Sequence, residues 1–116
     1  MQIVIFGRDG AYIDSCHSLA DLRKWQHTSV YEQAPFLIAM RPAIEAGQRV
    51  YLPAVDYLLG DMPGFFDFEV YLHPQHPQQC VWLIWDFTDL YKRFRQLQQA
   101  HHEWALQDEH TTQSRP

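Results

Sequence analysis

The sequence has little that would cross-link the chain, bind a metal through thiolates or attract nucleic acid. Its 116 residues include only two cysteines, Cys16 and Cys80, and no CxxC pair. Two isolated cysteines in a chain that is 47% hydrophobic predict buried thiols rather than a disulfide. Nine Lys and Arg residues against fourteen Asp and Glu residues give a formal net charge of -5, which argues against a nucleic-acid-binding surface.

Long apolar runs are also missing. No segment approaches the ~20 apolar residues that a membrane-spanning helix needs. The start, MQIVIFGRDG, has no basic region and no cleavage site, so it is read as a strand and not as a signal peptide. We therefore expect a soluble, cytoplasmic chain with one domain and one core.

The order of the expected elements is typical of an α+β domain. Asp9-Gly10 marks a tight turn between two strands, and Ser18 is a candidate cap for a short helix. Pro53 predicts an edge strand or a bulge. The expected elements are a hairpin at 2–15, helices at 18–27 and 34–48, strands at 49–59, 65–73 and 80–87, and a helix from 89 to about 109, followed by a disordered tail at 110–116.

Two strands are apolar on both faces. In QIVIF, Ile3 and Ile5 oppose Val4 and Phe6, and VWLIW has the same character, whereas FFDFEVYLH alternates between apolar and polar residues. A strand that is apolar on both faces is expected to be covered on both. We expect the second cover to come from the last helix, from a flanking segment or, as we prefer, from a second copy of the chain.

The stretch GFFDFEVY, and the later VWLIWDFTDLYKRF with its Asp86-Phe87-Thr88 junction, resemble the last strands and outgoing helix of the PAS domain family. IFGRDGAYIDS is similar to the opening hairpin of that family. The resemblance covers residues 2–108 and implies a five-stranded antiparallel sheet with helices on one face. It also implies that the first and last strands are central neighbours, and that a C-terminal amphipathic signalling helix follows a sensory core at 1–88.

Three residues form the expected signal junction: Asp86, Thr88 and Asp89. Thr88 is placed as the N-cap of the last helix, and Asp89 adds negative charge at the positive helix end. The resemblance implies that Asp86 pairs with a basic residue or with a backbone N–H near the helix start. A plain cap is the structural alternative to a signalling junction.

The last helix carries an apolar seam, because Leu90, Phe94, Leu97, His101 and Trp104 are spaced 4, 3, 4 and 3. The seam either packs on the sheet of its own chain or pairs with a second copy. The expected dimer contact comprises Ile3, Ile5, Trp82, Ile84, Leu90, Phe94, Leu97 and Trp104.

A small organic ligand would lie between the sheet and the helix that contains Phe36. The candidate lining residues are Phe36, Met40, Ile44, Leu52, Phe66, Phe68 and Leu83, although an ordinary filled core is the preferred interpretation. Flavin is not supported, because the Asn-Cys-Arg-Phe-Leu-Gln type of motif is missing, and for haem His27 is the nearest candidate but resembles a surface residue. The histidines have no metal-ligand spacing, so no cofactor or metal is expected.

The sequence thus favours a non-catalytic PAS-type sensory and dimerisation module. It would relay a signal through its last helix to an output domain in the same or another chain, such as a sensor histidine kinase of a two-component system or a cyclic-dinucleotide enzyme. One alternative is a small-molecule-binding domain with an apolar pocket. The least favoured alternative is a small cystatin-like α+β enzyme, since no nucleophile–base arrangement is visible.

Overall fold

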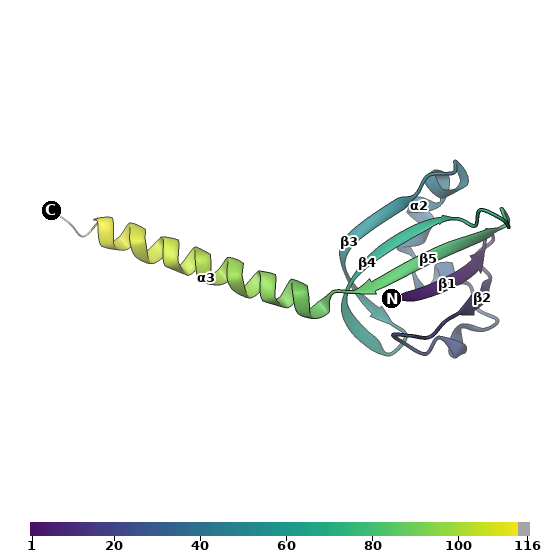
Figure 1. Cartoon of the computed structure of the whole chain (residues 1–116), viewed down its shortest axis with the longest axis horizontal. Helices are drawn as coiled ribbons and strands as arrows, with labels where there is room; N and C mark the ends of the chain where they lie inside the picture. Colours follow the sequence, from purple (N-terminus) through teal and green to yellow (C-terminus); the bar gives the residue numbers. More distant parts are fainter. Residues whose placement is uncertain (114–116) are drawn as a thin grey trace.

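A five-stranded antiparallel sheet forms the body of the protein (Figure 1). The computed structural model describes residues 1–113, with side chains described for residues 1–104. Along the chain the elements are β1 (Gln2–Gly7), β2 (Tyr12–Ser15), the 3-10 turn η1 (Arg23–Trp25), α1 (Val30–Gln33), α2 (Phe36–Glu45), β3 (Val50–Leu59), β4 (Met62–Leu72), β5 (Gln79–Asp86) and α3 (Thr88–Gln113).

The strand order is β2-β1-β5-β4-β3, and every neighbouring pair is antiparallel. The first and last strands are therefore neighbours at the centre, as the family resemblance implied, and their two-faced apolar character agrees with this position. β3 is an edge strand, and its pairing with β4 shifts register between Leu52 and Val55. Pro53 lies in that irregularity, which confirms the expected edge strand with a bulge.

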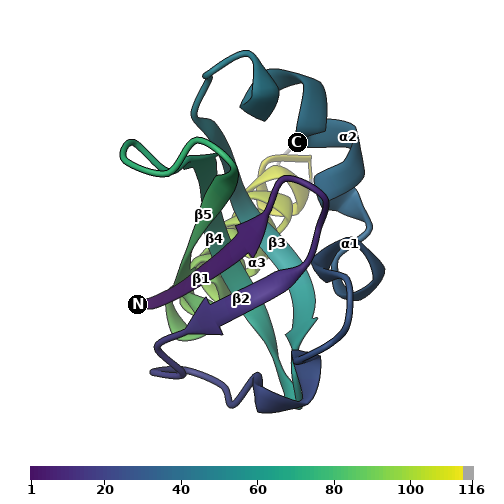
Figure 2. The ribbon, with the colours of Figure 1, turned by 90° about the vertical axis from the view of Figure 1, so that its right-hand side faces the viewer.

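The hydrophobic core lies between one face of the sheet and the segment that contains η1, α1 and α2 (Figure 2). Phe6, Phe66, Phe68 and Trp82 are fully buried there, and Phe68 meets Trp82 edge to face at 5.1 Å between ring centroids. Pro42 lies inside α2 without ending it. Aromatic packing of this density accounts for a large share of the apolar surface that the domain buries.

The opposite, outer face of the sheet carries a second apolar set. Ile3, Ile5 and Leu83 are half-buried, and Ile3 is directly opposite Leu83 in the pairing of β1 with β5. Trp82 and Ile84 alternate with them and lie in the core, so their expected place in a dimer contact is wrong. The reason is the two-residue period of a strand, which sends neighbouring side chains to opposite faces.

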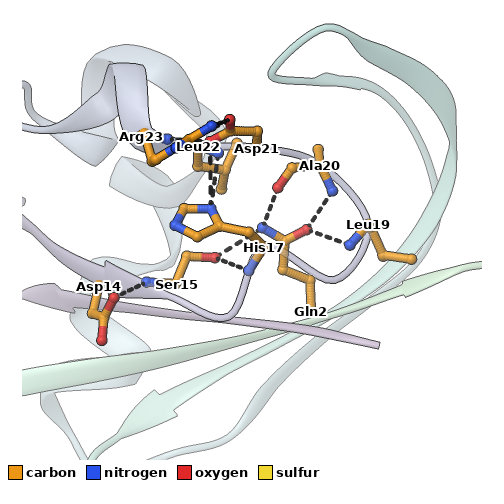
Figure 3. Close-up of polar contacts among 9 residues, drawn as sticks. All are labelled: Gln2, Asp14, Ser15, His17, Leu19, Ala20, Asp21, Leu22 and Arg23. Atoms are coloured by element: carbon orange, nitrogen blue, oxygen red, sulfur yellow. Dashed lines mark hydrogen bonds and ion pairs between the residues drawn. The ribbon is translucent and has the colours of Figure 1, made fainter.

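The helix expected at 18–27 is reduced to the 3-10 turn η1, and the buried side chain of Gln2 explains why (Figure 3). Its carbonyl oxygen accepts hydrogen bonds from the N–H groups of Leu19 at 3.1 Å and Ala20 at 2.8 Å. Its amide donates to the Ser15 hydroxyl and to the Ala20 carbonyl. These backbone groups are held by Gln2 and cannot join a helical ladder.

α3 leaves the end of β5 and projects away from the body of the domain (Figure 1). The molecule consequently measures 70 × 30 × 21 Å. Positions 110–113, which the sequence assigned to the tail, continue this helix, and positions 114–116 lie outside the described residues. Over the described residues, no helix has the length and apolar character needed to cross a membrane.

Candidate functional site at the base of the last helix

The link between β5 and α3 is a hydrogen-bonded turn made by Asp86 and Thr88. The Asp86 carboxylate accepts from the Thr88 N–H at 2.9 Å and from the Thr88 hydroxyl at 2.5 Å. A backbone N–H near the helix start is the partner that the family resemblance implied for Asp86. Thr88 itself is the first helical residue and its hydroxyl accepts no N–H of the first turn, so its expected role as N-cap is wrong.

The Thr88 hydroxyl instead connects the helix to β4. It accepts a hydrogen bond from the Phe65 N–H at 3.0 Å, while the Phe65 carbonyl accepts from the Phe87 N–H at 3.0 Å. The pairing of β4 with β5 thereby continues for one step beyond the last strand residue. A Cβ at Gly64 would overlap the Thr88 hydroxyl, so glycine is required for this close approach.

A second connection is centred on Asp67, which is only 4% exposed although it faces away from the core. Its carboxylate accepts hydrogen bonds from the hydroxyls of Tyr51 on β3 and Tyr91 on α3, the latter at 2.6 Å. It also accepts the Ala54 N–H at 2.9 Å. One buried carboxylate therefore joins β3, β4 and the first turn of α3.

The hydrogen bonds at Asp67 alter three pKa values. Burial opposes ionisation of the Asp67 carboxyl, but the donors Tyr51, Tyr91 and Ala54 together outweigh it and lower its pKa. The hydrogen bond to Asp67 is the main cause that raises the pKa of Tyr51 to about 12, and it raises the pKa of Tyr91 as well. At neutral pH the group is a carboxylate held by two neutral phenols.

The sequence did not predict this group. In the alternating pattern of FFDFEVYLH, Asp67 is one of the polar residues and therefore lies on the outer face. Tyr51 and Tyr91 lie 16 and 24 residues away, so only the sheet pairing and the position of α3 bring their hydroxyls to it. No local pattern around Asp67, Tyr51 or Tyr91 indicates that the three side chains meet.

Beyond its base, α3 presents an apolar surface. Leu90, Phe94, Leu97 and Trp104 are 59%, 55%, 69% and 64% exposed. They follow the 4-3-4-3 seam, which also contains the exposed His101. The sheet of the same chain therefore does not cover the seam, and α3 is amphipathic with its apolar side open.

The residues expected to line a pocket are mostly part of the packed core. Phe36 stacks on Phe68 at 5.5 Å, and Met40 and Ile44 are buried. The remaining members on this face are Leu52 and Phe66. Leu83 is the exception, because it lies on the outer face with Ile3 and cannot line the same space.

One polar atom in the core has no partner. The indole N–H of Trp82 is buried and makes no hydrogen bond within the part of the chain that the structure describes. Trp82 is surrounded by the rings of Trp25, Phe36, Tyr57 and Phe68. A buried donor without an acceptor costs roughly 1–3 kcal/mol.

A cavity of about 250 Å³ lies beside the base of α3, between the helix and the sheet. Its walls include Phe65, Tyr91, Phe94 and Arg95, and the Arg95 guanidinium lies 4.3 Å from the centre of the Phe65 ring. No group of three His, Cys, Asp or Glu side chains in the described residues is arranged to hold a metal ion. His27, the nearest haem-ligand candidate, is exposed.

Neither the protein-family models nor the curated proteins contain a match to this chain.

Proposed function

We propose that the chain is a non-catalytic PAS-type sensory module that relays a signal through α3 to an output domain. The observation that carries the proposal is the double attachment of α3. The Asp86–Thr88 turn connects the helix to β5 and β4, and the Asp67 group connects it to β3 and β4. A change in the twist or spacing of these strands would alter the direction of the helix.

The strand order and the position of the outgoing helix support the same class. The two strands that are apolar on both faces are central neighbours, as the resemblance to PAS domains implies. The open seam of α3 and the half-buried outer residues Ile3 and Ile5 support association with a second copy. A histidine kinase or a cyclic-dinucleotide enzyme is the kind of output domain that such a helix would control.

The proposal is tested by joining the intact chain, through α3, to the catalytic region of a histidine kinase. We expect the Thr88→Val variant to change autophosphorylation several-fold, because valine keeps the shape but removes the hydroxyl that binds Phe65. The matched control is Arg41→Lys on α2, which we expect to leave the activity unchanged. Equal activity of the parent chain and Thr88→Val, with both folded, would contradict the relay.

A small-molecule-binding domain is the second candidate, and the unpartnered Trp82 N–H favours it. A ligand with a carbonyl or another acceptor would satisfy this donor inside the aromatic cluster. Native mass spectrometry of freshly purified protein tests this directly. A retained small molecule that is lost in Trp82→Phe supports the binding function, and retention of the same molecule by Trp82→Phe argues against this position.

A further inference from the structure

The open seam of α3 is nearly symmetric about its middle residue. Relative to Leu97, the seam positions lie at -7, -3, +4 and +7, occupied by Leu90, Phe94, His101 and Trp104. An antiparallel copy of the same helix, crossing at Leu97, would place Leu90 beside Trp104 and Phe94 beside His101. The large apolar residues at the two ends of the seam would thus cover each other.

The charges of α3 are unequally distributed along its length. The first part, 88–95, carries three basic residues and one acidic residue, a net charge of +2. The middle, 96–100, has no charged residue, and the sequence at 101–113 carries three acidic residues and no Lys or Arg, a net charge of -3. An antiparallel pair sets the positive part of each helix against the negative part of the other, whereas a parallel pair sets like against like.

From these two observations we infer that α3 pairs with α3 of a second copy in antiparallel orientation, crossing at Leu97. This inference rests on the dimerisation in the proposed function and adds its geometry. The two sheet bodies then lie at opposite ends of the helix pair, and the C-terminal end of each helix points toward the body of the other copy.

The size of the seam limits the strength of the pair. Four large apolar side chains per copy contact the partner along about 21 Å of helix, a length that follows from the rise of ~1.5 Å per residue. We expect four side chains per copy to bury less surface than the roughly 1,200–2,000 Å² that a stable interface buries. We therefore expect reversible association at micromolar concentrations.

Cross-linking between two different chains, each with one exposed cysteine, tests the orientation. The full chain is used with Cys16→Ser, and the buried Cys80 is kept. Chains carrying Leu90→Cys or Trp104→Cys are mixed, oxidised gently and examined by intact mass. We expect the disulfide between positions 90 and 104 to exceed either homodimer, because the antiparallel pair brings these positions together.

Homodimers of each variant without the mixed product would show a parallel pair and overturn the inference, while the proposed dimer would stand. At a chain concentration of roughly 0.1 mM, about 100 times the expected micromolar dissociation constant, the dimer should predominate. A chain that still sediments as a monomer there would overturn the inference and the dimerisation together. Gln99→Cys, on the exposed polar side of α3, is the matched control and is expected to form little disulfide. If Gln99→Cys forms as much disulfide as positions 90 and 104, the antiparallel arrangement is also overturned, because the helices would then meet in no fixed orientation.

Ionic strength gives an independent measurement on the unmodified chain. Attraction between opposite charges is screened by salt, so we expect the dissociation constant of the pair to rise several-fold between low and high NaCl. A dissociation constant that falls as NaCl is added would overturn the antiparallel arrangement, since it is the behaviour of like charges placed together.

Discussion

Removal of the Tyr91 hydroxyl is the most direct test of how α3 is attached to the sheet. Tyr91→Phe keeps the ring, which packs edge-on against Phe65 at 6.4 Å, and deletes only the hydrogen bond to Asp67. Hydrogen bonds to a charged group are worth about 1.5–3 kcal/mol. Since Asp67 keeps two other donors and Tyr91 is partly exposed, we expect a loss of free energy of unfolding at or just below the lower end of that range, about 1–1.5 kcal/mol.

Two measurements check this value. Urea unfolding gives the change in the global free energy, and native-state hydrogen exchange gives the change at the first turns of α3. The matched control is Tyr71→Phe on the same sheet face, because the Tyr71 hydroxyl makes no hydrogen bond among the described residues and its ring lies 4.0 Å from the Arg49 guanidinium. We expect this control to change stability by less than about 0.5 kcal/mol.

Combination with Tyr51→Phe makes the test sharper. The double variant leaves the buried carboxylate with only the Ala54 N–H, so we expect it to lose more than the sum of the two single variants. If Tyr91→Phe behaves like Tyr71→Phe in both measurements, the Asp67 group does not fasten the helix and the reasoning fails.

Three further changes test other contacts. Gly64→Ala would push a methyl group against the Thr88 hydroxyl, and we expect it to lower the free energy of unfolding by about 1–3 kcal/mol in urea titrations; an unchanged midpoint would contradict the close approach. Gln2→Met removes the hydrogen bonds that the Gln2 side chain makes with the N–H groups of Leu19 and Ala20 and with the Ala20 carbonyl. Each buried group left unpaired costs about 1–3 kcal/mol, so we expect thermal melting to show a loss of stability of about 2–4 kcal/mol. The folded pKa of Asp67 is lowered, so its ionised form contributes stability above the unfolded pKa of about 3.9, and that contribution is lost as the pH falls toward the folded pKa. The free energy of unfolding of Asp67→Asn should therefore fall less steeply between about pH 5 and 3 than that of the parent chain. An equally steep fall would refute the stabilising role of the ionised Asp67 carboxylate.

The sheet could be predicted because its strands carry strong local patterns. The alternation in 65–73 and the two-faced apolar strands at 2–6 and 80–87 gave the element types, and the two-faced strands also indicated the centre of the sheet. The sheet face on which each side chain lies was harder to predict, and Trp82, Leu83 and Ile84 were each placed on the wrong face. A shift of one position exchanges core and outer face, and no local signal marks where the helices cover the strand.

The contacts at the base of α3 could be predicted only in part. Asp86 and Thr88 are two residues apart, so their interaction is local and the Asp-x-Thr pattern indicated it. The other contacts join distant parts of the chain: Phe65 on β4 is 23 residues from Thr88. The donors to Asp67 are Ala54 and Tyr51 on β3, 13 and 16 residues away, and Tyr91 on α3, 24 residues away. Whether a hydroxyl caps its own helix or binds a neighbouring strand depends on tertiary approach, which in this chain requires the absence of a side chain at Gly64.

The length of α3 makes these few contacts at its base consequential. With about 1.5 Å per residue, the 26 residues of the helix extend roughly 39 Å from the sheet. A tilt of only ~5° at the Asp86–Thr88 turn would displace the far end by about 3 Å, on the order of two residues of helical rise. The two attachments contact different strands, because Thr88 binds β4 beside β5 and Tyr91 reaches the carboxylate that is shared with β3. A movement of β3 relative to β5 would therefore shift one attachment more than the other and turn the helix, whereas a movement of the whole sheet would only carry it along.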